Sequence, residues 1–379
     1  MNFSLTKQQL LFQQMIREFA EKEVKPLAAE VDEQERFPME TVEKMAKIGI
    51  MGIPIPTQYG GAGGSNLLYS IAVEELSAAC ATTGVIVSAH TSLCAAPILE
   101  HGTEAQKQKY LPKLASGEWI GAFGLTEPNA GTDASAQQTT AVLDGDNYII
   151  NGSKIFITNA IYAHVYVIFA MTDKSQGVKG ITAFIVEKGT PGFSIGKKEK
   201  KMGIRGSATC ELIFENCIVP KENLLGKVSG GFGIAMKTLD GGRVGIASQA
   251  LGIAQGAMDE TVKYIKERKQ FGKPISAFQN TAFQMADLET RVEAARLLVR
   301  SAAFKKDSGA PYSVDAAMAK LYAAETAMEV TNKAIQFHGG YGYTREYPVE
   351  RMMRDAKITE IYEGTSEVQR MVISASLFK

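Results

Sequence analysis

The spacing of apolar residues changes twice along this chain, and that change limits the folds open to it. Apolar residues recur at helical spacing over residues 1–117, alternate with a period of two over residues 119–225, and return to helical spacing after Gly230. Because no long helices separate the strands of the middle segment, we expect an antiparallel sheet or barrel there rather than a doubly wound parallel sheet. The predicted fold class is therefore α+β.

The length predicts more than one domain, since 379 residues exceed what a single hydrophobic core usually serves. The changes of period predict an N-terminal all-α domain over residues 1–118, a central antiparallel β-barrel or sandwich over 119–229, and a domain like a four-helix bundle over 230–379. Helices of the last domain are predicted at Gly233–Lys269, Ala277–Ser308, Val314–Phe337, Val349–Tyr362 and Glu367–Leu377.

Local signals predict where several other elements begin and end. Thr6 and Gln9 have the spacing of a helix-opening capping box, and Asp144-Gly145-Asp146 is typical of a hairpin turn. The glycine-rich residues 52–64 match no phosphate-binding pattern and are predicted to be a loop between helices. Besides the hairpin Val142–Ile150, strands are predicted at Lys154–Thr158, Val165–Thr172, Thr182–Glu187 and Glu211–Phe214.

Composition excludes several classes of function. The 41 basic and 41 acidic residues create no overall field for nucleic acid or an anionic membrane. The four cysteines form no CxxC pair and the four histidines are scattered, so no metal site is expected. No apolar run approaches the length that spans a bilayer, and the N-terminus lacks the features of a targeting presequence. We therefore expect a cytoplasmic protein without membrane insertion.

Glu363 lies where one predicted helix stops and another starts. Gly364 supplies the positive φ that commonly ends a helix, and Ser366 with Gln369 has capping-box spacing for the next one. A carboxylate at such a fixed corner, beside apolar and aromatic neighbours, would be partly desolvated, which would raise its pKa toward the range of a general base. From the residues alone, an ordinary helix-terminal Glu is the commoner explanation.

Three C-terminal stretches together resemble one known family. They are Gln336-Phe337-His338-Gly339-Gly340-Tyr341-Gly342-Tyr343, residues 345–351 and residues 354–370. Their sequence resembles that of the acyl-CoA dehydrogenase flavoproteins, the similarity covers the whole chain, and the short-chain (butyryl-CoA) members resemble it most. The resemblance implies the three-domain architecture predicted above, an FAD cofactor, and Glu363 as the catalytic base.

The segment Phe123–Asp133 follows a predicted strand and contains two hydroxyls with turn-forming Pro and Gly. By composition it is a β-turn, although such a loop can also direct N–H groups toward a ring edge or a phosphate. In the resembling family it is a flavin-binding signature, in which Thr132 here replaces the usual Ser. Phe156 stands where many members carry Trp, with an ordinary strand aromatic as the alternative. The resemblance implies flavin contacts at Phe123, Leu125, Thr126, Gly131, Thr132, Phe156, Thr158, Arg268, Gln270, Phe271, Phe278, Gln279, Gln336, Phe337, Gly339, Gly340, Thr365 and Glu367.

Arg268 ends a long predicted helix, where a cation is favourable for purely structural reasons. The resembling family uses this Arg on the flavin pyrophosphate of a neighbouring subunit. Since no Rossmann fingerprint occurs anywhere in the chain, a dinucleotide would have to be held by dispersed loops and helix ends.

Two adjacent glycines, Gly241 and Gly242, lie early in a predicted helix, where each costs roughly 1 kcal/mol relative to Ala. Either a tightly packed neighbouring helix or the close approach of another group explains them. In the resembling family Gly242 occupies the position from which isovaleryl and long-chain members supply their base, and it offers no carboxylate here. The resemblance implies substrate contacts at Thr132, Asp240, Arg243, Tyr362, Glu363 and Gly364.

The sequence therefore predicts an FAD-dependent acyl-CoA dehydrogenase acting on a short-chain substrate such as butyryl-CoA. Glu363 would remove the Cα proton, FAD would accept the Cβ hydride, and the product would be a trans-2-enoyl-CoA. The resemblance implies an electron-transferring flavoprotein as oxidant and a homotetramer. Alternatives are crotonyl-CoA reduction, another chain length or a branched substrate, a flavin oxidase, and a non-catalytic flavin or acyl-CoA binding protein.

Overall fold

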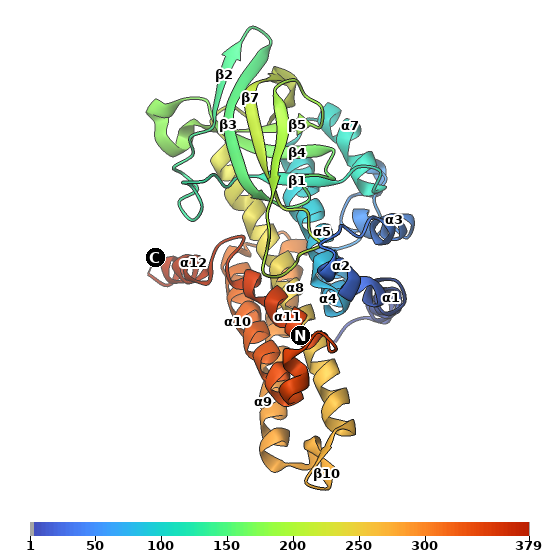
Figure 1. The fold of residues 1–379 in the computed structure, drawn as a ribbon. Coiled ribbons are helices and arrows are strands. Elements are labelled where there is room, and N and C mark those ends of the chain that lie inside the picture. The colour runs from blue at the N-terminus through green and yellow to red at the C-terminus, as the bar shows by residue number, and fades with distance from the viewer. Residues whose placement is uncertain (1–3, 379) are drawn as a thin grey trace.

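The computed structural model describes residues 4–378, and the outer ends of the first and last predicted domains lie outside them. Figure 1 shows helices at the N-terminus, a sheet at one end of the molecule, and a bundle of long C-terminal helices that extends away from the sheet. The predicted α+β succession of helices, sheet and helices is confirmed.

The N-terminal region is helical throughout, apart from short connecting loops. Thr6 opens its first helix through the predicted capping box with Gln9. Residues 52–64 form the predicted loop, with two short 3₁₀ turns at Ile50–Gly52 and Thr57–Tyr59. The α-helices are α1 (Lys7–Phe19), α2 (Ala28–Glu33), α3 (Met39–Lys47), α4 (Asn66–Ala79), α5 (Ala81–Ser88), α6 (Ala96–His101) and α7 (Glu104–Ala115), and Ala20–Val24 and Ala89–Ala95 are π-helical.

The expectation that no segment is long and apolar enough to span a membrane is wrong for one stretch. Ala81–His101, which comprises α5, the π-helical turn and α6, meets that description by length and hydropathy. The fold buries 89% of the most apolar 18 residues of this stretch. The buried ring of His90 accepts a hydrogen bond from the N–H of Gly121 at 3.1 Å. This stretch is a core helix that joins the helical region to the sheet.

The predicted sheet is confirmed, and it is mixed rather than purely antiparallel. The hairpin of β2 and β3 turns at Gly145 as expected, but the predicted strand Lys154–Thr158 is the continuation of β3. The pairings β1–β4 and β2–β4 are parallel, and the other named pairings of this sheet are antiparallel. The strands are β1 (Gly121–Gly124), β2 (Thr140–Asp144), β3 (Asn147–Ile157), β4 (Val165–Met171), β5 (Ile181–Glu187), β6 (Phe193–Lys198), β7 (Cys210–Pro220) and β8 (Leu224–Leu225).

The C-terminal region packs long helices around small side chains. Alanines at buried positions of the three longest helices form one core cluster, which lets the helix backbones approach closely. The helix predicted to reach Tyr362 ends earlier and is followed by a 3₁₀ turn, Ile358–Glu360. The helices are α8 (Gly231–Glu267), α9 (Gln279–Asp307), α10 (Ser313–His338), α11 (Val349–Lys357) and α12 (Ser366–Leu377), and β9 (Lys269–Gln270) and β10 (Lys273–Pro274) form a small hairpin between α8 and α9.

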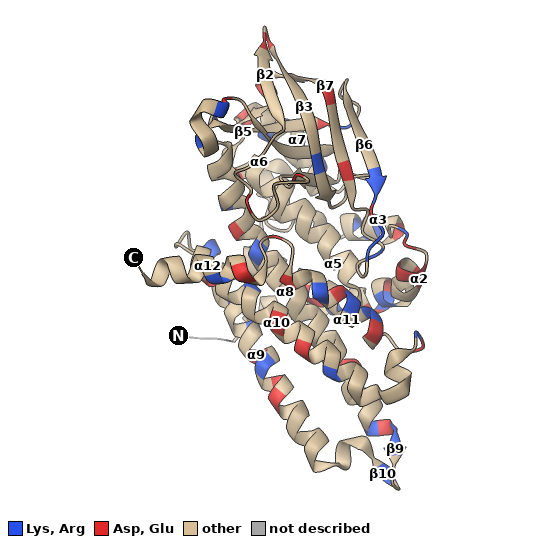
Figure 2. Ribbon diagram, turned by 60° about the vertical axis from the view of Figure 1, so that its left-hand side comes forward, with Lys and Arg blue, Asp and Glu red and all other residues tan. Residues whose placement is uncertain are grey.

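A charged cluster on α11 ties the three regions together, and Figure 2 shows both signs of charge on this helix. Arg354 donates to both carboxylate oxygens of Asp32 in α2, at 3.0 and 2.6 Å, and to the carbonyl of Met202. Asp355 accepts from the N–H of Ile204 at 2.5 Å, and burial raises the pKa of this carboxyl to about 6. The loop between β6 and β7 is therefore held against both helical regions.

Candidate active site

Glu363 lies at a sharp corner between the 3₁₀ turn Ile358–Glu360 and α12. Its φ is 53° and that of Gly364 is 93°, so two consecutive residues adopt left-handed backbone conformations. Such a conformation costs a non-glycine residue roughly 1–2 kcal/mol, and strained residues of this kind cluster at functional sites. The predicted positive φ of Gly364 is thus observed, and the fold also holds the preceding Glu in a costly conformation.

The prediction that Ser366 forms a capping box with Gln369 is wrong, because the helix begins one residue earlier than predicted. Thr365 is the N-cap of α12, and its hydroxyl accepts from the N–H of Val368 at 3.4 Å. Gln369 instead donates its side-chain amide to the carbonyl of Gly364 at 2.8 Å. Because two hydroxyl residues are adjacent here, the sequence pattern alone favours the wrong one.

One oxygen of the Glu363 carboxylate is buried and unsatisfied. Its Oε2 atom is buried and has no hydrogen-bond partner among the described residues, although the residue as a whole is only half-buried. Burial raises the pKa of Glu363 to about 8, and the positive charges of Lys320 and Arg243 limit that rise. A carboxyl group whose pKa lies near neutrality is suited to general acid–base catalysis.

Gly242 on α8 faces this carboxylate directly. A Cβ atom added at Gly242 would collide with Oε2 of Glu363 and lie 2.8 Å from Cδ2 of Leu93. Of the two explanations for the paired glycines, close approach by another group accounts for Gly242. The two positions at which the resembling family places its base are therefore adjacent in space, although 121 residues separate Gly242 and Glu363 (363 − 242).

The predicted substrate-side residues on α8 form an ion pair close to Glu363. Arg243 donates to Asp240 at 2.6 Å, and Asp240 also accepts from the hydroxyl of Ser313 at 2.9 Å. The Nε atom of Arg243 is buried and has no hydrogen-bond partner among residues 4–378. Tyr362 donates its hydroxyl to the side-chain carbonyl of Gln249, farther along α8. Arg243 therefore has an unused donor that a polar ligand group can satisfy.

A small cavity of about 80 Å³ lies near this part of α8. Tyr69 lines this cavity, and its hydroxyl donates to the hydroxyl of Ser88. A Cβ atom added at Gly245 would lie 2.5 Å from the Tyr69 hydroxyl. Gly245 lies about one helical turn after Gly242 on α8. Burial raises the pKa of Tyr69 to about 12, so this hydroxyl remains protonated at neutral pH. Its lining is Pro54, Ile55, Asn66, Tyr69, Thr91, Ser92, Ala95, Ala96, Leu99, Glu100 and Lys306.

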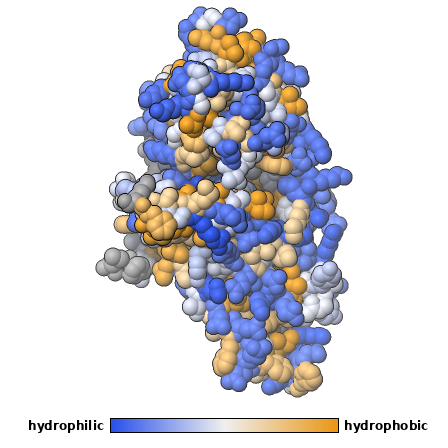
Figure 3. Space-filling model, turned by 90° about the vertical axis from the view of Figure 1, so that its left-hand side faces the viewer, coloured by the Kyte–Doolittle hydropathy of each residue, from blue (hydrophilic) through white to orange (hydrophobic). Residues whose placement is uncertain are grey.

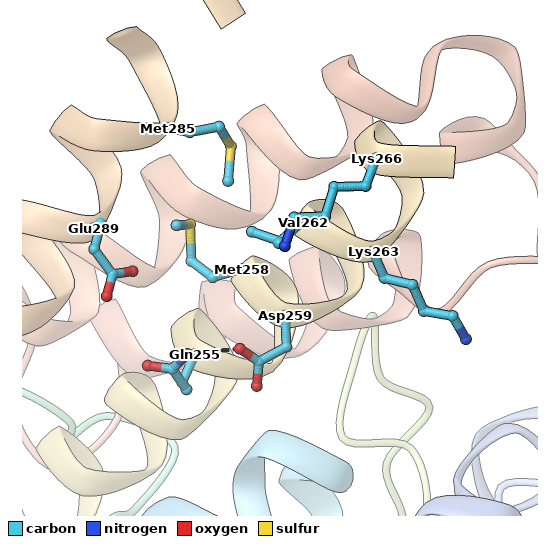
Figure 4. A pocket seen from close by; sticks show the side chains of 8 residues that line it. All are labelled: Gln255, Met258, Asp259, Val262, Lys263, Lys266, Met285 and Glu289. Carbon is cyan, nitrogen blue, oxygen red and sulfur yellow. Dashed lines mark hydrogen bonds between the residues drawn. The ribbon is translucent and has the colours of Figure 1, made fainter. Parts of the chain in front are cut away.

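A larger groove, of about 610 Å³, lies elsewhere, between α8 and α9 (Figure 4). Figure 4 shows Met258 and Val262 from α8 and Met285 from α9 along it, with Gln255 hydrogen-bonded to Asp259. None of its lining residues belongs to the predicted site. The groove is open to solvent and is separate from the buried carboxylate, so we do not assign the chemistry to it.

The loop after β1 is anchored by a buried ion pair that the sequence analysis missed. Lys154 on β3 is fully buried, and its ammonium donates to Glu127 at 2.7 Å, to the carbonyl of Leu125 at 3.2 Å and to Gln137 at 3.0 Å. Burial alone would raise the pKa of Glu127, but Lys154 holds it below its ordinary value. The loop that carries Thr126, Gly131 and Thr132 is therefore fixed at its base, while Gly131 and Thr132 remain exposed.

Phe156, two residues after Lys154, presents an aromatic ring to solvent. Its φ is 61° and 61% of its surface is exposed, so the fold keeps a large apolar side chain in a strained and unburied state. The neighbouring N–H of Ile155 bonds to the carbonyl of Thr126 at 2.9 Å, which places Phe156 beside the loop after β1. An exposed ring beside the exposed residues Gly131 and Thr132 fits a flat aromatic ligand such as a flavin.

Thr365 and Glu367 lie at the start of α12, next to Glu363, but a second group of predicted flavin residues lies at the other end of the molecule. The β9–β10 hairpin projects from the end of the bundle opposite the sheet (Figure 1). There the guanidinium of Arg268 lies 5.7 Å from the ring centre of Tyr341, and the ring of Phe271 is 94% exposed. The same end carries Gln270, Phe278, Gln279, Gln336, Phe337, Gly339 and Gly340, where α8, α9 and α10 meet. One copy of the chain therefore does not bring all the predicted flavin contacts together.

Three family profiles match the chain and together span nearly all of it. They describe the acyl-CoA dehydrogenase N-terminal domain over residues 6–118, the middle domain over residues 122–217, and the C-terminal domain over residues 229–378.

Known proteins resemble the chain over its whole length. A short-chain specific acyl-CoA dehydrogenase of Clostridium acetobutylicum is 67% identical and covers 100% of both chains. An acryloyl-CoA reductase (NADH) of Anaerotignum propionicum is 53% identical over 100% of this chain and 96% of its own. The structure of butyryl-CoA dehydrogenase from Megasphaera elsdenii has a TM-score of 0.98 and 54% identity, with 100% of both chains covered. A chain from a structural study of the electron transferring flavoprotein of Acidaminococcus fermentans has a TM-score of 0.99 and 60% identity, again with 100% of both chains covered.

Proposed function

This chain belongs to the acyl-CoA dehydrogenase family, and on that premise we propose that it oxidises short-chain acyl-CoA thioesters, butyryl-CoA foremost, to trans-2-enoyl-CoA products with Glu363 as the base. It is an FAD-dependent enzyme of that family. The observation that carries the proposal is the enclosed Oε2 atom of Glu363, which has no hydrogen-bond partner among the described residues and belongs to a carboxyl group with a pKa of about 8.

The proposed reaction breaks two C–H bonds and forms one C=C bond. Glu363 takes the Cα proton and leaves the electron pair to form the double bond, while the hydrogen on Cβ departs with its own pair. FAD, when bound, supplies the acceptor for that hydride. Hydrogen bonds to the thioester carbonyl would stabilise the enolate charge that develops, and burial of the site would strengthen them by excluding water.

The residues that would hold the cofactor and the substrate approach the corner from different elements. Phe156 and Thr158 would face the flavin ring, with Phe123, Leu125, Thr126, Gly131 and Thr132 at its edge and Thr365 and Glu367 on α12. Asp240 and Arg243 would hold the thioester substrate from α8, with Thr132, Tyr362 and Gly364 beside it. The buried Nε of Arg243, which has no partner among residues 4–378, supports this assignment because a bound ligand would satisfy it.

The likeness to short-chain relatives supports a short acyl substrate. One of these relatives is a short-chain specific acyl-CoA dehydrogenase and another is a butyryl-CoA dehydrogenase of nearly the same fold. We expect kcat/KM to be highest for butyryl-CoA and lower for octanoyl-CoA and isovaleryl-CoA. Steady-state rates with an artificial electron acceptor would test this order. Octanoyl-CoA as the best substrate would overturn the short-chain assignment and leave the chemistry standing.

We also propose that an electron-transferring flavoprotein accepts the electrons and that the enzyme works in the cytoplasm as a homotetramer. The resemblance to the chain from the Acidaminococcus fermentans study supports the first part. Figure 3, which faces the side that carries α12, shows apolar side chains among hydrophilic ones. On α12 and just after it, Met371, Leu377 and Phe378 are exposed, as at a contact between subunits.

Because the predicted flavin residues are divided between two ends of the molecule, the proposed assembly can be tested directly. If Arg268 holds the FAD pyrophosphate of a neighbouring subunit, Arg268→Ala should weaken FAD binding by about one to two orders of magnitude, since a charge-assisted hydrogen bond contributes roughly 1.5–3 kcal/mol. Flavin loss should loosen assembly, and added FAD should restore it by mass action. Sedimentation and flavin content measured over an FAD titration would show this.

Lys266→Ala is the matched control, because this cation lies on the last turn of the same helix but at no predicted flavin position. It should leave flavin content and assembly as in the parent protein. Full flavin content of Arg268→Ala at low concentration, or flavin loss with assembly unchanged at every dilution, would exclude the role of Arg268 between subunits.

Three other functions can be distinguished from the proposed one. Crotonyl-CoA or acryloyl-CoA reduction is favoured by the reductase relative, and equilibration of reduced enzyme with crotonyl-CoA would detect it. A flavin oxidase would turn over with oxygen alone, whereas a dehydrogenase needs another acceptor, and rates with and without oxygen distinguish them. A non-catalytic binding protein is disfavoured because the buried carboxylate of Glu363 is present.

A further inference from the structure

Lys320, in the middle of α10, is a buried cation beside the catalytic corner. Its side chain is fully buried, and its ammonium donates one hydrogen bond, to the carbonyl of Gly364 at 2.7 Å. Among residues 4–378 no carboxylate lies within ion-pair distance of this ammonium. Burying a charge without a paired counter-ion is expensive, and leucine or methionine would fill this position in an alanine-rich bundle at much lower cost. Ordinary packing therefore does not explain a lysine here.

The Gly364 carbonyl is held from two sides. Gln369 on α12 donates to it at 2.8 Å, and Lys320 donates to it from α10. This carbonyl immediately follows Glu363, and both residues of the corner adopt positive φ. Because such a conformation persists only where the surroundings enforce it, these two donors fix the direction in which the Glu363 side chain leaves the backbone.

Lys320 also differs from Gln369 in charge. The groups that face Glu363 are Lys320 from α10, Arg243 from α8, and the hydroxyls of Tyr69 and Tyr362. Arg243 is already paired with Asp240, whereas the described residues leave Lys320 without an ion-pair partner. On its other sides Lys320 experiences the charges of Glu360 and Glu367, which lie at either end of the corner. Burial lowers the pKa of Lys320 to about 8, while the negative charge of Glu363 opposes that fall, so the ammonium is charged at pH 7. Among the described groups that face the carboxylate, Lys320 is the positive charge without an ion-pair partner.

We propose that Lys320 is a positioning residue for the catalytic base: its ammonium fixes the Glu363–Gly364 corner through the Gly364 carbonyl, and its charge stabilises the ionised carboxylate that accepts the Cα proton. Gln369 also holds the Gly364 carbonyl, but its neutral side chain does not stabilise the ionised carboxylate. The proposal rests on the proposed function for its effect on rate, but the ionisation of Glu363 can be measured whether or not the enzyme turns over.

The test compares Lys320→Met with Gln369→Met. Both variants remove one donor to the Gly364 carbonyl, and only the first removes a charge. The carboxyl C=O stretching band of Glu363, obtained as an infrared difference against Glu363→Gln, reports its ionisation over a pH titration of the FAD-loaded protein. In Lys320→Met the pKa of Glu363 should rise by roughly one unit, the lower end of the effect of a nearby opposite charge. In Gln369→Met it should stay within a few tenths of the parent value.

Anaerobic flavin reduction by butyryl-CoA gives the second measurement. At pH 7 the rate of Lys320→Met should fall about tenfold, because the upward shift leaves about a tenth as much of the base ionised. The loss should be recovered as the pH rises through the shifted pKa, whereas the slower rate of Gln369→Met should not be recovered. If Lys320→Met does not fold, Lys320→Gln takes its place, because Gln keeps an N–H donor and lacks the charge. The same rise in the pKa of Glu363 is expected for Lys320→Gln.

An unshifted Glu363 band in folded, FAD-loaded Lys320→Met would overturn the proposal, and so would an equal shift in Gln369→Met. If the parent protein fails to reduce its flavin with any acyl-CoA, the proposed function fails, and the infrared titration still decides whether Lys320 sets the ionisation of Glu363.

Discussion

Replacing Glu363 by Gln is expected to slow flavin reduction by butyryl-CoA at least about 100-fold, the usual contribution of a positioned general base. Gln has nearly the same shape and keeps hydrogen-bonding capacity, so FAD and acyl-CoA should still bind and the corner should survive. In the parent protein the rate should rise as the pH rises through the raised pKa of about 8, because only the ionised carboxylate accepts a proton. The variant should lose this dependence.

Glu325→Gln is a suitable control, since Glu325 lies on α10 near Lys320, is exposed, and bonds to Arg370 at 2.5 Å. It should reduce its flavin at the parent rate. If Glu363→Gln bleached its flavin as fast as the parent protein in a single turnover, Glu363 would have no part in proton removal.

Moving the carboxylate across the site is expected to restore part of the activity. In Glu363→Gly the base is gone, and adding Gly242→Glu should raise the rate of flavin reduction at least about tenfold above that background. The physical reason is the collision described above between a Cβ at Gly242 and Oε2 of Glu363. Removing the Glu363 side chain ends that collision, and only the flexible end of Leu93, 2.8 Å away, must still shift. Within a helix Glu also costs less than Gly by roughly 0.5–1 kcal/mol.

Gly242→Gln in the same Glu363→Gly background fills the space without supplying a base, and it should not recover. Single-turnover rates of both double variants, with flavin content measured alongside, separate chemistry from folding. A folded, FAD-loaded Gly242→Glu variant with no recovery would contradict the placement of Gly242 beside the reacting Cα–H bond.

The sequence predicted features that depend on neighbours along the chain. The changes of period located the helical and sheet regions, because helix and strand periodicities differ. The Gly145 turn and the Thr6 capping box use residues within three positions of each other. The N-cap of α12 was misplaced because Gln369 bonds to Gly364 instead of closing a capping box. The parallel pairing of β1 with β4 was not predicted, since strands more than 40 residues apart leave no local signal of their direction.

The buried lysines were the functional features that the sequence hid most completely. Lys154 lies on a strand, and its partner Glu127 precedes it by 27 positions. Lys320 lies on a helix and bonds to a backbone carbonyl 44 positions away. Their side chains have the same identity as solvated surface lysines, so only the fold distinguishes them. By contrast, Gly241 and Gly242 did give a usable signal, because adjacent glycines within a helix carry a cost that requires an explanation.

The most direct test of the account is anaerobic mixing of the FAD-loaded protein with butyryl-CoA, followed by the flavin absorbance and by chromatography of the thioesters. The yellow colour should fade as trans-crotonyl-CoA forms, with one flavin reduced for each molecule of product, and flavin reduction in Glu363→Gln should be at least about 100-fold slower. Flavin that stays oxidised in the presence of bound butyryl-CoA, or bleaching that is equally fast without the Glu363 carboxylate, would contradict the account.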